Sequence, residues 1–127
     1  MIRVMIVDDH AFVRDQVIAA LQAADGIVVV GECADGAEVS SLADAVRPDV
    51  VVMDVRMPVT SGPAATVDLM TRQPATRVLM LTGSASARAI SESAQAGAVG
   101  LLVKGGAAHQ LIDAVRTIAD GGTVWPG

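Results

Sequence analysis

The stretch that decides the fold runs from residue 49 to residue 54 and reads Asp49-Val50-Val51-Val52-Met53-Asp54. Four consecutive apolar residues, three of them β-branched, stand between two aspartates. A run that is continuously apolar rather than alternating suits a strand buried on both faces, which is typical of a parallel sheet. The stretch therefore predicts a strand that is buried on both faces and is followed by a carboxylate.

Four further short apolar runs lie on either side of this stretch and predict four more strands. They are Val4 to Val7, Ile27 to Val30, Val78 to Leu81, and Val99 to Val103 with Gly100 inside it. Most of them are rich in Val and Ile, as buried strands are. Parallel strands cannot be joined by tight turns, so each connection must be a long crossover, usually a helix.

The segments between the runs have the periodicity of such helices. Apolar residues return there at three- and four-residue spacing in three stripes, which are Val13, Val17 and Leu21; Val39, Leu42 and Val46; and Leu111, Val115 and Ile118. Another helix begins at Gly62-Pro63, because proline is tolerated in the first turn of a helix, and we expect it to run to about Arg72. A fifth helix, from Ser86 to Gln95, is apolar mainly through Ala and Ile90, so we expect it to be the least tightly packed. The pattern predicts a three-layer α/β domain with right-handed crossovers.

Length and composition agree with one folded domain. The chain has 127 residues, and 52% of them are hydrophobic, the reverse of a disordered composition. Its net charge is −5, with one Lys, eight Arg and no basic cluster, so nonspecific binding to nucleic acid is not expected. One Phe, one Trp and no Tyr leave no pair of aromatic side chains to stack bases.

The termini and the single cysteine bear on location and domain organisation. Cys33 is alone, so no intrachain disulfide forms, and a reducing cytoplasm is the simplest interpretation. The first apolar run is too short for a signal peptide, and no stretch is long enough for a membrane span. We expect residues 1–121 to form the domain and residues 122–127 to be a tail or the start of a linker to an output domain absent from this chain.

Chemistry-bearing side chains follow four of the five runs. Asp8 and Asp9 follow the first, Asp54 the third, Thr82 the fourth and Lys104 the fifth, while Gly31 and Glu32 after the second offer nothing comparable. Ligands of open parallel sheets bind beyond the carboxyl ends of the strands. We therefore expect three carboxylates, one hydroxyl and the only lysine at one edge of the sheet.

These residue types predict an aspartyl-phosphate site. Three neighbouring carboxylates repel one another, and a divalent cation such as Mg²⁺, which prefers oxygen ligands, removes that repulsion. A carboxylate beside Mg²⁺ is a suitable nucleophile toward a phosphoryl group. Lys104 and Thr82 would then bind the oxygens of the acquired group.

Plainer roles are open to the same residues. Asp8 and Asp9 could cap the following helix, Thr82 could satisfy local backbone, and Lys104 could be solvated. His10 is a candidate for a second phosphosite, but we expect a local role in hydrogen bonding or packing at the pocket edge. Other residues have expected roles outside the site: five methionines as core filling, Cys33 as a buried small residue, and Trp125 either loosely packed or at a junction to another domain.

The ordered motifs resemble the receiver domains of bacterial two-component response regulators. They are Val7-Asp8-Asp9-His10, Met53-Asp54-Val55-Arg56-Met57-Pro58, Leu81-Thr82-Gly83 and Val103-Lys104. Together with Ala96-Gly97-Ala98-Val99-Gly100, the first two are similar to the NarL/FixJ (LuxR) type. The resemblance covers essentially the whole chain and implies a flavodoxin-like (βα)5 fold with strand order 2-1-3-4-5.

The resemblance also implies roles for individual residues. Asp54 would be the phosphoacceptor, and Lys104 and Thr82 would bind the phosphoryl group. Asp9 and Asp54 would hold Mg²⁺ directly, with the backbone carbonyl of Arg56, and Asp8 would act mostly through water. The implied partners are a sensor histidine kinase, a second copy of the chain in a phosphorylation-dependent homodimer, and DNA through an absent helix-turn-helix domain. The domain would not be an enzyme, beyond assisting its own phosphorylation and dephosphorylation.

Two positions depart from that family pattern. Leu101 stands where most receivers have a Tyr or Phe that reports phosphorylation, and Gly105 stands where many have a proline in a cis bond or an aspartate. These departures keep open a degenerate receiver that serves as a constitutive interaction module. A haloacid-dehalogenase-type phosphohydrolase is a further alternative, which is opposed by Arg56 at the place of that family's second aspartate.

Overall fold

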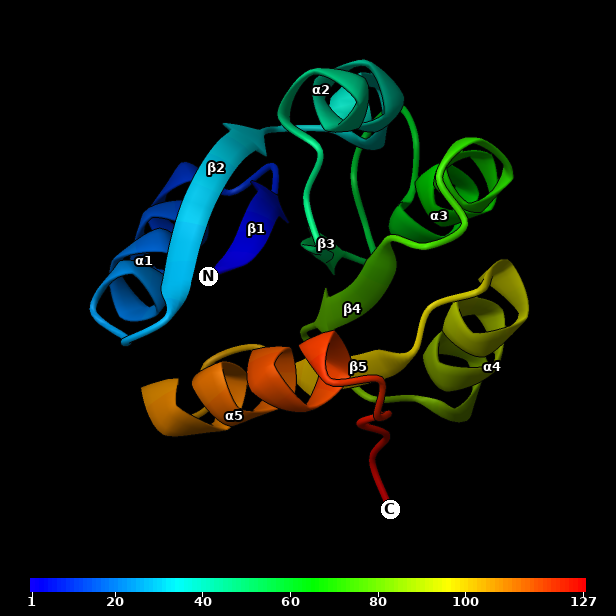
Figure 1. Cartoon of the computed structure of the whole chain (residues 1–127). Coiled ribbons are helices and arrows are strands. Elements are labelled where there is room, and N and C mark those ends of the chain that lie inside the picture. The colour runs from blue at the N-terminus through cyan, green and yellow to red at the C-terminus, as the bar shows by residue number, and fades with distance from the viewer.

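The computed structural model describes residues 1–127 and contains one parallel sheet (Figure 1). Its strands are β1 (Ile2–Val7), β2 (Ile27–Cys33), β3 (Val50–Asp54), β4 (Arg77–Thr82) and β5 (Gly100–Val103). They lie in the order β2-β1-β3-β4-β5, and every neighbouring pair is parallel. This is the predicted flavodoxin-like order, and the five predicted strands are all present.

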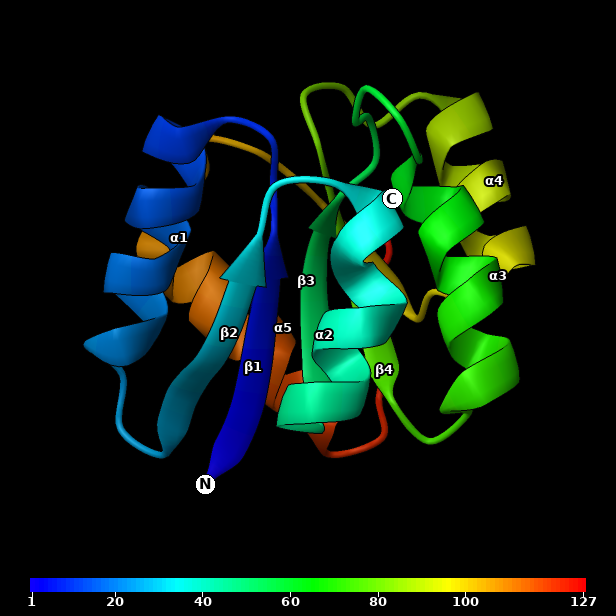
Figure 2. The same ribbon diagram turned by 90° about the horizontal axis from the view of Figure 1, so that it is seen from above.

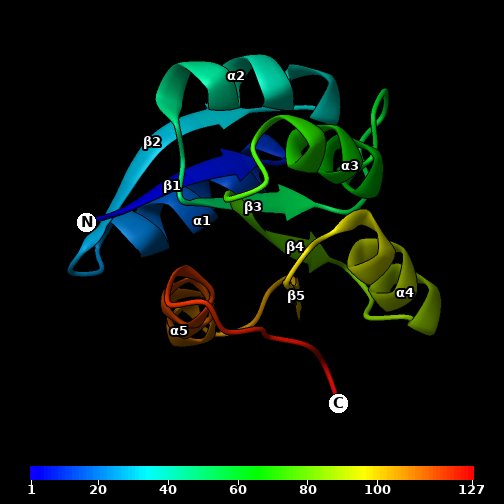
Figure 3. The same ribbon diagram turned by 45° about the vertical axis from the view of Figure 1, so that its right-hand side comes forward.

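Five α-helices cover the two faces of the sheet. They are α1 (Ala11–Gln22), α2 (Val39–Val46), α3 (Gly62–Arg72), α4 (Ala87–Ala96) and α5 (Ala108–Ala119), and a short 3₁₀ helix, Gly36–Glu38, precedes α2. Figures 2 and 3 show α1 and α5 on one face and α2, α3 and α4 on the other. The predicted three-layer architecture is confirmed.

The central strand β3 is buried along its whole length because helices pack on both of its faces. Val51 and Met53 belong to the hydrophobic cluster beneath α2, α3 and α4, whereas Val50 and Val52 belong to the cluster beneath α1 and α5. Burying each of these side chains stabilises the fold by about 1.5–3 kcal/mol. The continuous apolar run found in the sequence is therefore a strand with two buried faces.

Helix α4 is the most loosely packed of the five, as its composition predicts. Its only buried residue is Ser93, whose hydroxyl has no hydrogen-bond partner, while Ala89 and Ile90 pack on the core with part of their surface exposed. Helix α3, in contrast, buries four residues. Helix α4 is thus less firmly packed on the sheet than α3.

The C-terminal tail lies along the outer edge of β5. The backbone N–H of Leu101 donates to the carbonyl of Val124 at 2.8 Å, and the N–H of Val124 donates to the carbonyl of Val99 at 3.1 Å. Trp125 packs against the core cluster beneath α2, α3 and α4. The tail therefore pairs with an edge strand that would otherwise present free backbone groups.

None of the helices has the length and apolar character that a membrane-spanning helix needs.

Candidate functional site

The carboxyl ends of four strands bring the predicted site residues to one edge of the sheet. Asp54 and Thr82 are the last residues of β3 and β4, and Asp8 and Lys104 directly follow β1 and β5. Asp8 is 1% exposed and Asp54 is 4% exposed. Both carboxylates are therefore removed from water at the place where the parallel topology gathers the strand ends.

Lys104 joins two of the carboxylates. Its Nζ lies 2.9 Å from Oδ2 of Asp8 and 2.9 Å from Oδ2 of Asp54. Burial by itself lowers the pKa of Lys104, but the hydrogen bonds and charges of Asp54 and Asp8 outweigh it and raise that pKa above its ordinary value. Lys104 is therefore a fixed ammonium group, and the expectation that it lies solvated away from the pocket is excluded.

Asp54 is only partly compensated by these contacts. Burial raises the pKa of its carboxyl group above the ordinary value, the hydrogen bond and charge of Lys104 lower it, and the charge of Asp8 raises it again. The backbone N–H of Arg56 donates to Asp54 Oδ1 at 3.3 Å, a long hydrogen bond. Burial is the largest of these influences, so the net effect is a raised pKa for Asp54.

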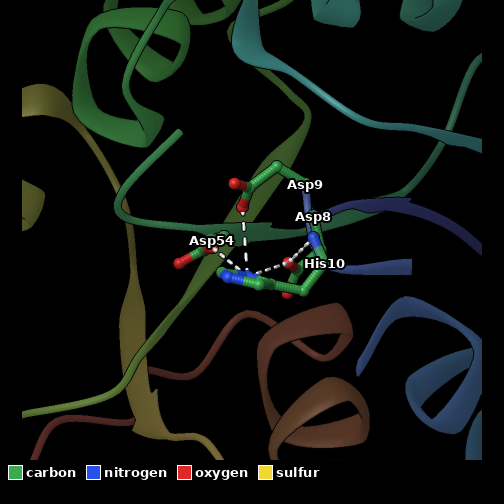
Figure 4. Close-up of side chains that lie close together, drawn as sticks. All are labelled: Asp8, Asp9, His10 and Asp54. Carbon is green, nitrogen blue, oxygen red and sulfur yellow. Dashed lines mark hydrogen bonds and ion pairs between the residues drawn. The ribbon is translucent and has the colours of Figure 1, made fainter. Parts of the chain in front are cut away.

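Asp9 and His10 complete an acidic cluster above the strand ends (Figure 4). Nδ1 of His10 lies 3.2 Å from Asp9 Oδ1, 3.3 Å from Asp8 Oδ1 and 3.9 Å from Asp54 Oδ2. Asp9 Oδ1 is buried and accepts no hydrogen bond. The N-cap of α1 is His10, without a side-chain capping bond, so capping of that helix is not what holds Asp8 and Asp9 in place.

Thr82 lies at the site, but its hydroxyl is occupied locally. Oγ1 of Thr82 donates to the carbonyl of Ser84 at 2.9 Å and accepts from the N–H of Ser84 at 3.2 Å. Its own carbonyl accepts from the backbone N–H of Lys104 at 2.7 Å, which fixes the two residues side by side. The structure thus shows the local role of Thr82, with the hydroxyl hydrogen-bonded to Ser84 and not to Asp54.

The two departures from the family pattern have simple structural descriptions. Leu101 is completely buried in the core cluster beneath α2, α3 and α4. The peptide bond between Lys104 and Gly105 is trans, and Gly105 has φ +84°, a left-handed conformation that favours glycine. Leu101 is therefore a core residue, and Gly105 lets the chain turn immediately after Lys104.

The end of β2 adds no side chain to the acidic cluster, but an aspartate just beyond it supports the site in a way that the sequence did not reveal. The strand extends past Val30 to Cys33, and Asp35 follows. Asp35 Oδ1 accepts from the N–H groups of Ala37 at 2.9 Å and Thr60 at 3.0 Å, and Oδ2 accepts from Val59 at 3.0 Å. The carboxylate of Asp35 thus binds the β3–α3 loop, the loop that begins after Asp54.

The missed residue had a signal in the sequence. Asp35 and Glu38 have the spacing of a capping box, and Glu38 accepts hydrogen bonds from the N–H groups of Ala34 and Asp35 at 3.1 Å each. The hydrogen bonds from Ala37, Val59 and Thr60 hold the pKa of Asp35 below its ordinary value. A capping motif could have been recognised, although its reach to Val59 and Thr60 could not.

Cys33 is half-buried rather than fully buried. Burial, followed by the charge of Glu38, raises the pKa of its thiol to about 11. Because the thiolate is the reactive form of cysteine, this thiol is unreactive near neutral pH. The environment of Cys33 agrees with a packing role.

A five-stranded parallel sheet with an acidic pocket and a lysine at its carboxyl edge defines a receiver-type signalling domain. The chain belongs to the response regulator receiver domain family, whose pattern matches residues 4–116. Members of this family are signalling domains rather than catalytic enzymes.

Relatives place the chain in the NarL/LuxR type. The uncharacterized transcriptional regulatory protein YxjL of Bacillus subtilis (strain 168) is 38% identical over 98% of this chain and 57% of its own length. The DNA-binding transcriptional activator DevR/DosR of Mycobacterium tuberculosis is 39% identical over 95% of this chain and 56% of its own length. The chain thus spans a little over half the length of these curated relatives.

A solved structure agrees with this placement. The receiver domain of the putative response regulator NarL from Mycobacterium tuberculosis superposes with a TM-score of 0.90 at 33% identity, over 94% of this chain and 97% of the other. The resemblance to NarL/FixJ-type receivers inferred from the motifs is confirmed.

Proposed function

We propose that this domain is a phosphorylation-controlled switch in a two-component system and that Asp54 accepts the phosphoryl group from a sensor histidine kinase. The observation that carries the proposal is the shared lysine: Nζ of Lys104 lies 2.9 Å from both Asp54 and Asp8. A buried carboxylate with a raised pKa, beside a fixed ammonium group, is typical of a reactive site.

The transfer step uses groups of this chain. A carboxylate oxygen of Asp54 attacks phosphorus, the P–N bond of a phosphohistidine breaks, and its electron pair leaves with the imidazole. The acyl phosphate carries more negative charge than the carboxylate it replaces. Lys104 is already in contact with Asp54 Oδ2 and is placed to bind an oxygen of the new group.

The acidic pocket fits Mg²⁺. Three carboxylates face one lysine, so negative charge exceeds positive charge in the pocket, and carboxylate oxygens are the ligands that Mg²⁺ prefers. We propose that Asp9, Asp54 and the backbone carbonyl of Arg56 hold Mg²⁺ and that Asp8 acts through water. The ion supplies positive charge that offsets the carboxylates and the transferred oxygens.

Thr82 is proposed as the switch residue. To reach a phosphoryl oxygen its hydroxyl must give up its two hydrogen bonds with Ser84, each worth about 0.5–1.5 kcal/mol. Hydrogen bonds to a charged group are worth about 1.5–3 kcal/mol. The hydrogen bonds that Thr82 loses and the one that it gains are therefore similar in free energy, as a switch between two states requires. We expect the weakly packed helix α4 to move when Thr82 changes partner.

The output steps belong to the same proposal. Phosphorylation would promote homodimerisation, and a helix-turn-helix domain outside this chain would bind DNA and control transcription. We propose that residues 1–121 form the receiver unit, that residues 122–127 are a tail or the start of a linker, and that the protein is located in the cytoplasm. The domain would assist its own phosphorylation and dephosphorylation without acting on other substrates.

Acetyl phosphate with Mg²⁺, followed by intact-mass measurement, tests the phosphoacceptor. Wild type should gain one phosphoryl group, about 80 Da, and Asp54→Asn should gain none. Asp15→Asn is the matched control, since Asp15 is an exposed aspartate of α1, and it should behave as wild type. Absence of an adduct on wild type would refute the switch and favour a degenerate receiver, whereas turnover of small phosphate esters would indicate a phosphohydrolase.

Dimerisation is tested separately by size-exclusion elution with and without beryllofluoride, which stands in for the phosphoryl group. The dimer should elute earlier than the unmodified domain. Unchanged elution alongside a positive mass adduct would remove dimerisation from the proposal and leave Asp54 as the acceptor.

A further inference from the structure

We propose that His10 supplies a nitrogen ligand to the cation pocket, so that the pocket binds borderline transition-metal ions such as Ni²⁺ and Zn²⁺ more tightly than Mg²⁺. This inference rests on the proposed function, which places a divalent cation among Asp8, Asp9 and Asp54. It extends that site from a set of oxygen ligands to a mixed set of oxygen and nitrogen ligands.

The geometry of the ring is that of a ligand. One donor atom each from Asp8, Asp9, His10 and Asp54 lies within 4.8 Å of all the others. Nδ1 of His10 is the atom that faces the three carboxylates (Figure 4), at 3.2, 3.3 and 3.9 Å. Ligands bound at about 2.0–2.2 Å to one tetrahedral ion stand roughly 3.3–3.6 Å apart. The observed spacings are close to those of atoms that share one ion.

The contacts that orient the His10 ring are all with the carboxylates of the pocket: Nδ1 lies within hydrogen-bonding distance of Asp8 Oδ1 at 3.3 Å. His10 is the N-cap residue of α1, but its side chain makes no capping hydrogen bond, and 64% of the side chain is exposed. Its backbone N–H is held by Asp8 Oδ1 at 2.9 Å, which fixes the residue at the pocket edge. The imidazole is thus anchored at its backbone and directed at the carboxylates, with space for an ion to approach from solvent.

The chemistry of the donor set decides which ions benefit. Carboxylates and waters suit Mg²⁺, whereas imidazole suits Zn²⁺ and Ni²⁺, whose affinities for mixed nitrogen and oxygen sites are also intrinsically higher. Three carboxylates and the ammonium group of Lys104 carry a formal charge of −2, which one divalent cation neutralises. Nδ1 therefore adds selectivity without adding charge.

Calorimetric titration of the whole chain with Ni²⁺ and with Mg²⁺ tests the inference, with the visible absorption of Co²⁺ as a second readout of nitrogen ligation. Wild type should bind Ni²⁺ more tightly than Mg²⁺. His10→Ala should weaken Ni²⁺ binding roughly tenfold or more, as loss of a metal-site partner does, and alter the Co²⁺ spectrum. Its Mg²⁺ affinity should stay within about twofold of wild type, since the carboxylates remain.

Two further variants serve as controls for this titration. His109→Ala removes the only other histidine, an exposed residue of α5 outside the cluster, and should leave all three measurements unchanged. His10→Asn keeps a residue favoured at helix N-caps, so it preserves α1 if the alanine variant folds poorly, and it should also lose Ni²⁺ affinity.

The outcomes separate this inference from the function it extends. Equal Ni²⁺ affinity in wild type and in both His10 variants, with Mg²⁺ still bound, would overturn the role of His10 and leave the Mg²⁺ pocket intact. Failure of every divalent cation to bind, together with no mass adduct from acetyl phosphate, would overturn both. A fall in Ni²⁺ affinity for His109→Ala but not for His10→Ala would assign the nitrogen ligand to α5 and refute the proposal.

Discussion

Two aspartates near the carboxyl edge of the same sheet have opposite environments. Asp35, just after β2, accepts three backbone hydrogen bonds, which hold its pKa below the ordinary value. Asp54, at the end of β3, accepts one long backbone hydrogen bond and shares Lys104 with Asp8, and burial raises its pKa. Burial, which acts mainly on Asp54, and backbone hydrogen bonds, which act mainly on Asp35, shift the pKa values of the two carboxyl groups in opposite directions.

The two aspartates both contact the β3–α3 loop. The N–H groups that Asp35 binds belong to Val59 and Thr60 in the β3–α3 loop, which leaves Asp54. That loop also carries Arg56, whose N–H contacts Asp54. Asp35 therefore positions the loop that leads away from Asp54.

Removing the shared lysine should have the largest effect on stability. Lys104→Met leaves two buried carboxylates without a cation, and we expect it to lower the free energy of unfolding by about 3 kcal/mol in urea titrations without divalent ions. Adding Asp54→Asn to this variant should restore part of the loss. Arg72→Met, which breaks the exposed ion pair with Asp44, is the control and should cost at most about 1 kcal/mol. Similar losses for the two single variants would contradict a site-specific role of Lys104.

Separating the segment that follows β2 from the β3–α3 loop should have the next largest effect on stability. A Cβ at Gly36 would collide with the backbone carbonyl of Thr60 and lie 3.1 Å from Cβ of Ala65, so Gly36→Ala should lower the free energy of unfolding by about 1–3 kcal/mol. Gly83→Ala, at the exit of β4, is the matched control because a Cβ there meets nothing within 4 Å. Equal urea midpoints for the two variants would show that the contact between the loops is not tight.

Neutralising Asp54 should have a smaller effect of opposite sign. Asp54→Asn removes an under-compensated buried charge, and we expect it to raise the free energy of unfolding by about 0.5–2 kcal/mol at neutral pH with EDTA present. Replacing EDTA with Mg²⁺ should stabilise wild type more than the variant, since binding to the folded state adds to stability. A variant less stable than wild type in EDTA would mean that Asp54 is fully compensated by Lys104.

The smallest effect expected is a difference in pH dependence. Because the pKa of Asp54 is raised in the folded state, its carboxylate lowers stability at neutral pH, and this loss is relieved as pH falls through the folded pKa. The pKa of Asp35 is lowered, so its contribution is present above the unfolded pKa of about 3.9 and is lost as pH falls through the folded value.

Thermal melts from pH 7 to pH 3 would measure both trends. Relative to Asp54→Asn, wild type should gain stability as the solution is acidified. Relative to Asp35→Asn, the advantage of wild type should be constant down to about pH 5 and then shrink. Parallel curves for all three proteins would contradict the contrast between the two aspartates.

Much of the site could be predicted because the parallel topology converts sequence order into proximity. Asp8, Asp54, Thr82 and Lys104 each end or follow a predicted strand, so their convergence needed no side-chain information. The end of β2 was misjudged because its apolar run stops at Val30, although the strand continues through Gly31 and Glu32 to Cys33. Backbone pairing with β1, not apolar character, extends that strand.

The sequence by itself determined the strands and which residue types meet at their carboxyl ends, since continuous apolar runs mark strands buried on both faces, and the strand order followed from the resemblance to receiver domains. Only the tertiary structure decided how those residues share their partners: Lys104 between Asp8 and Asp54, Thr82 with Ser84, Asp35 with Val59 and Thr60, and His10 toward the carboxylates. The reason is physical. Burial follows from local pattern, whereas a hydrogen bond depends on competing donors from distant segments and on differences of a fraction of an ångström.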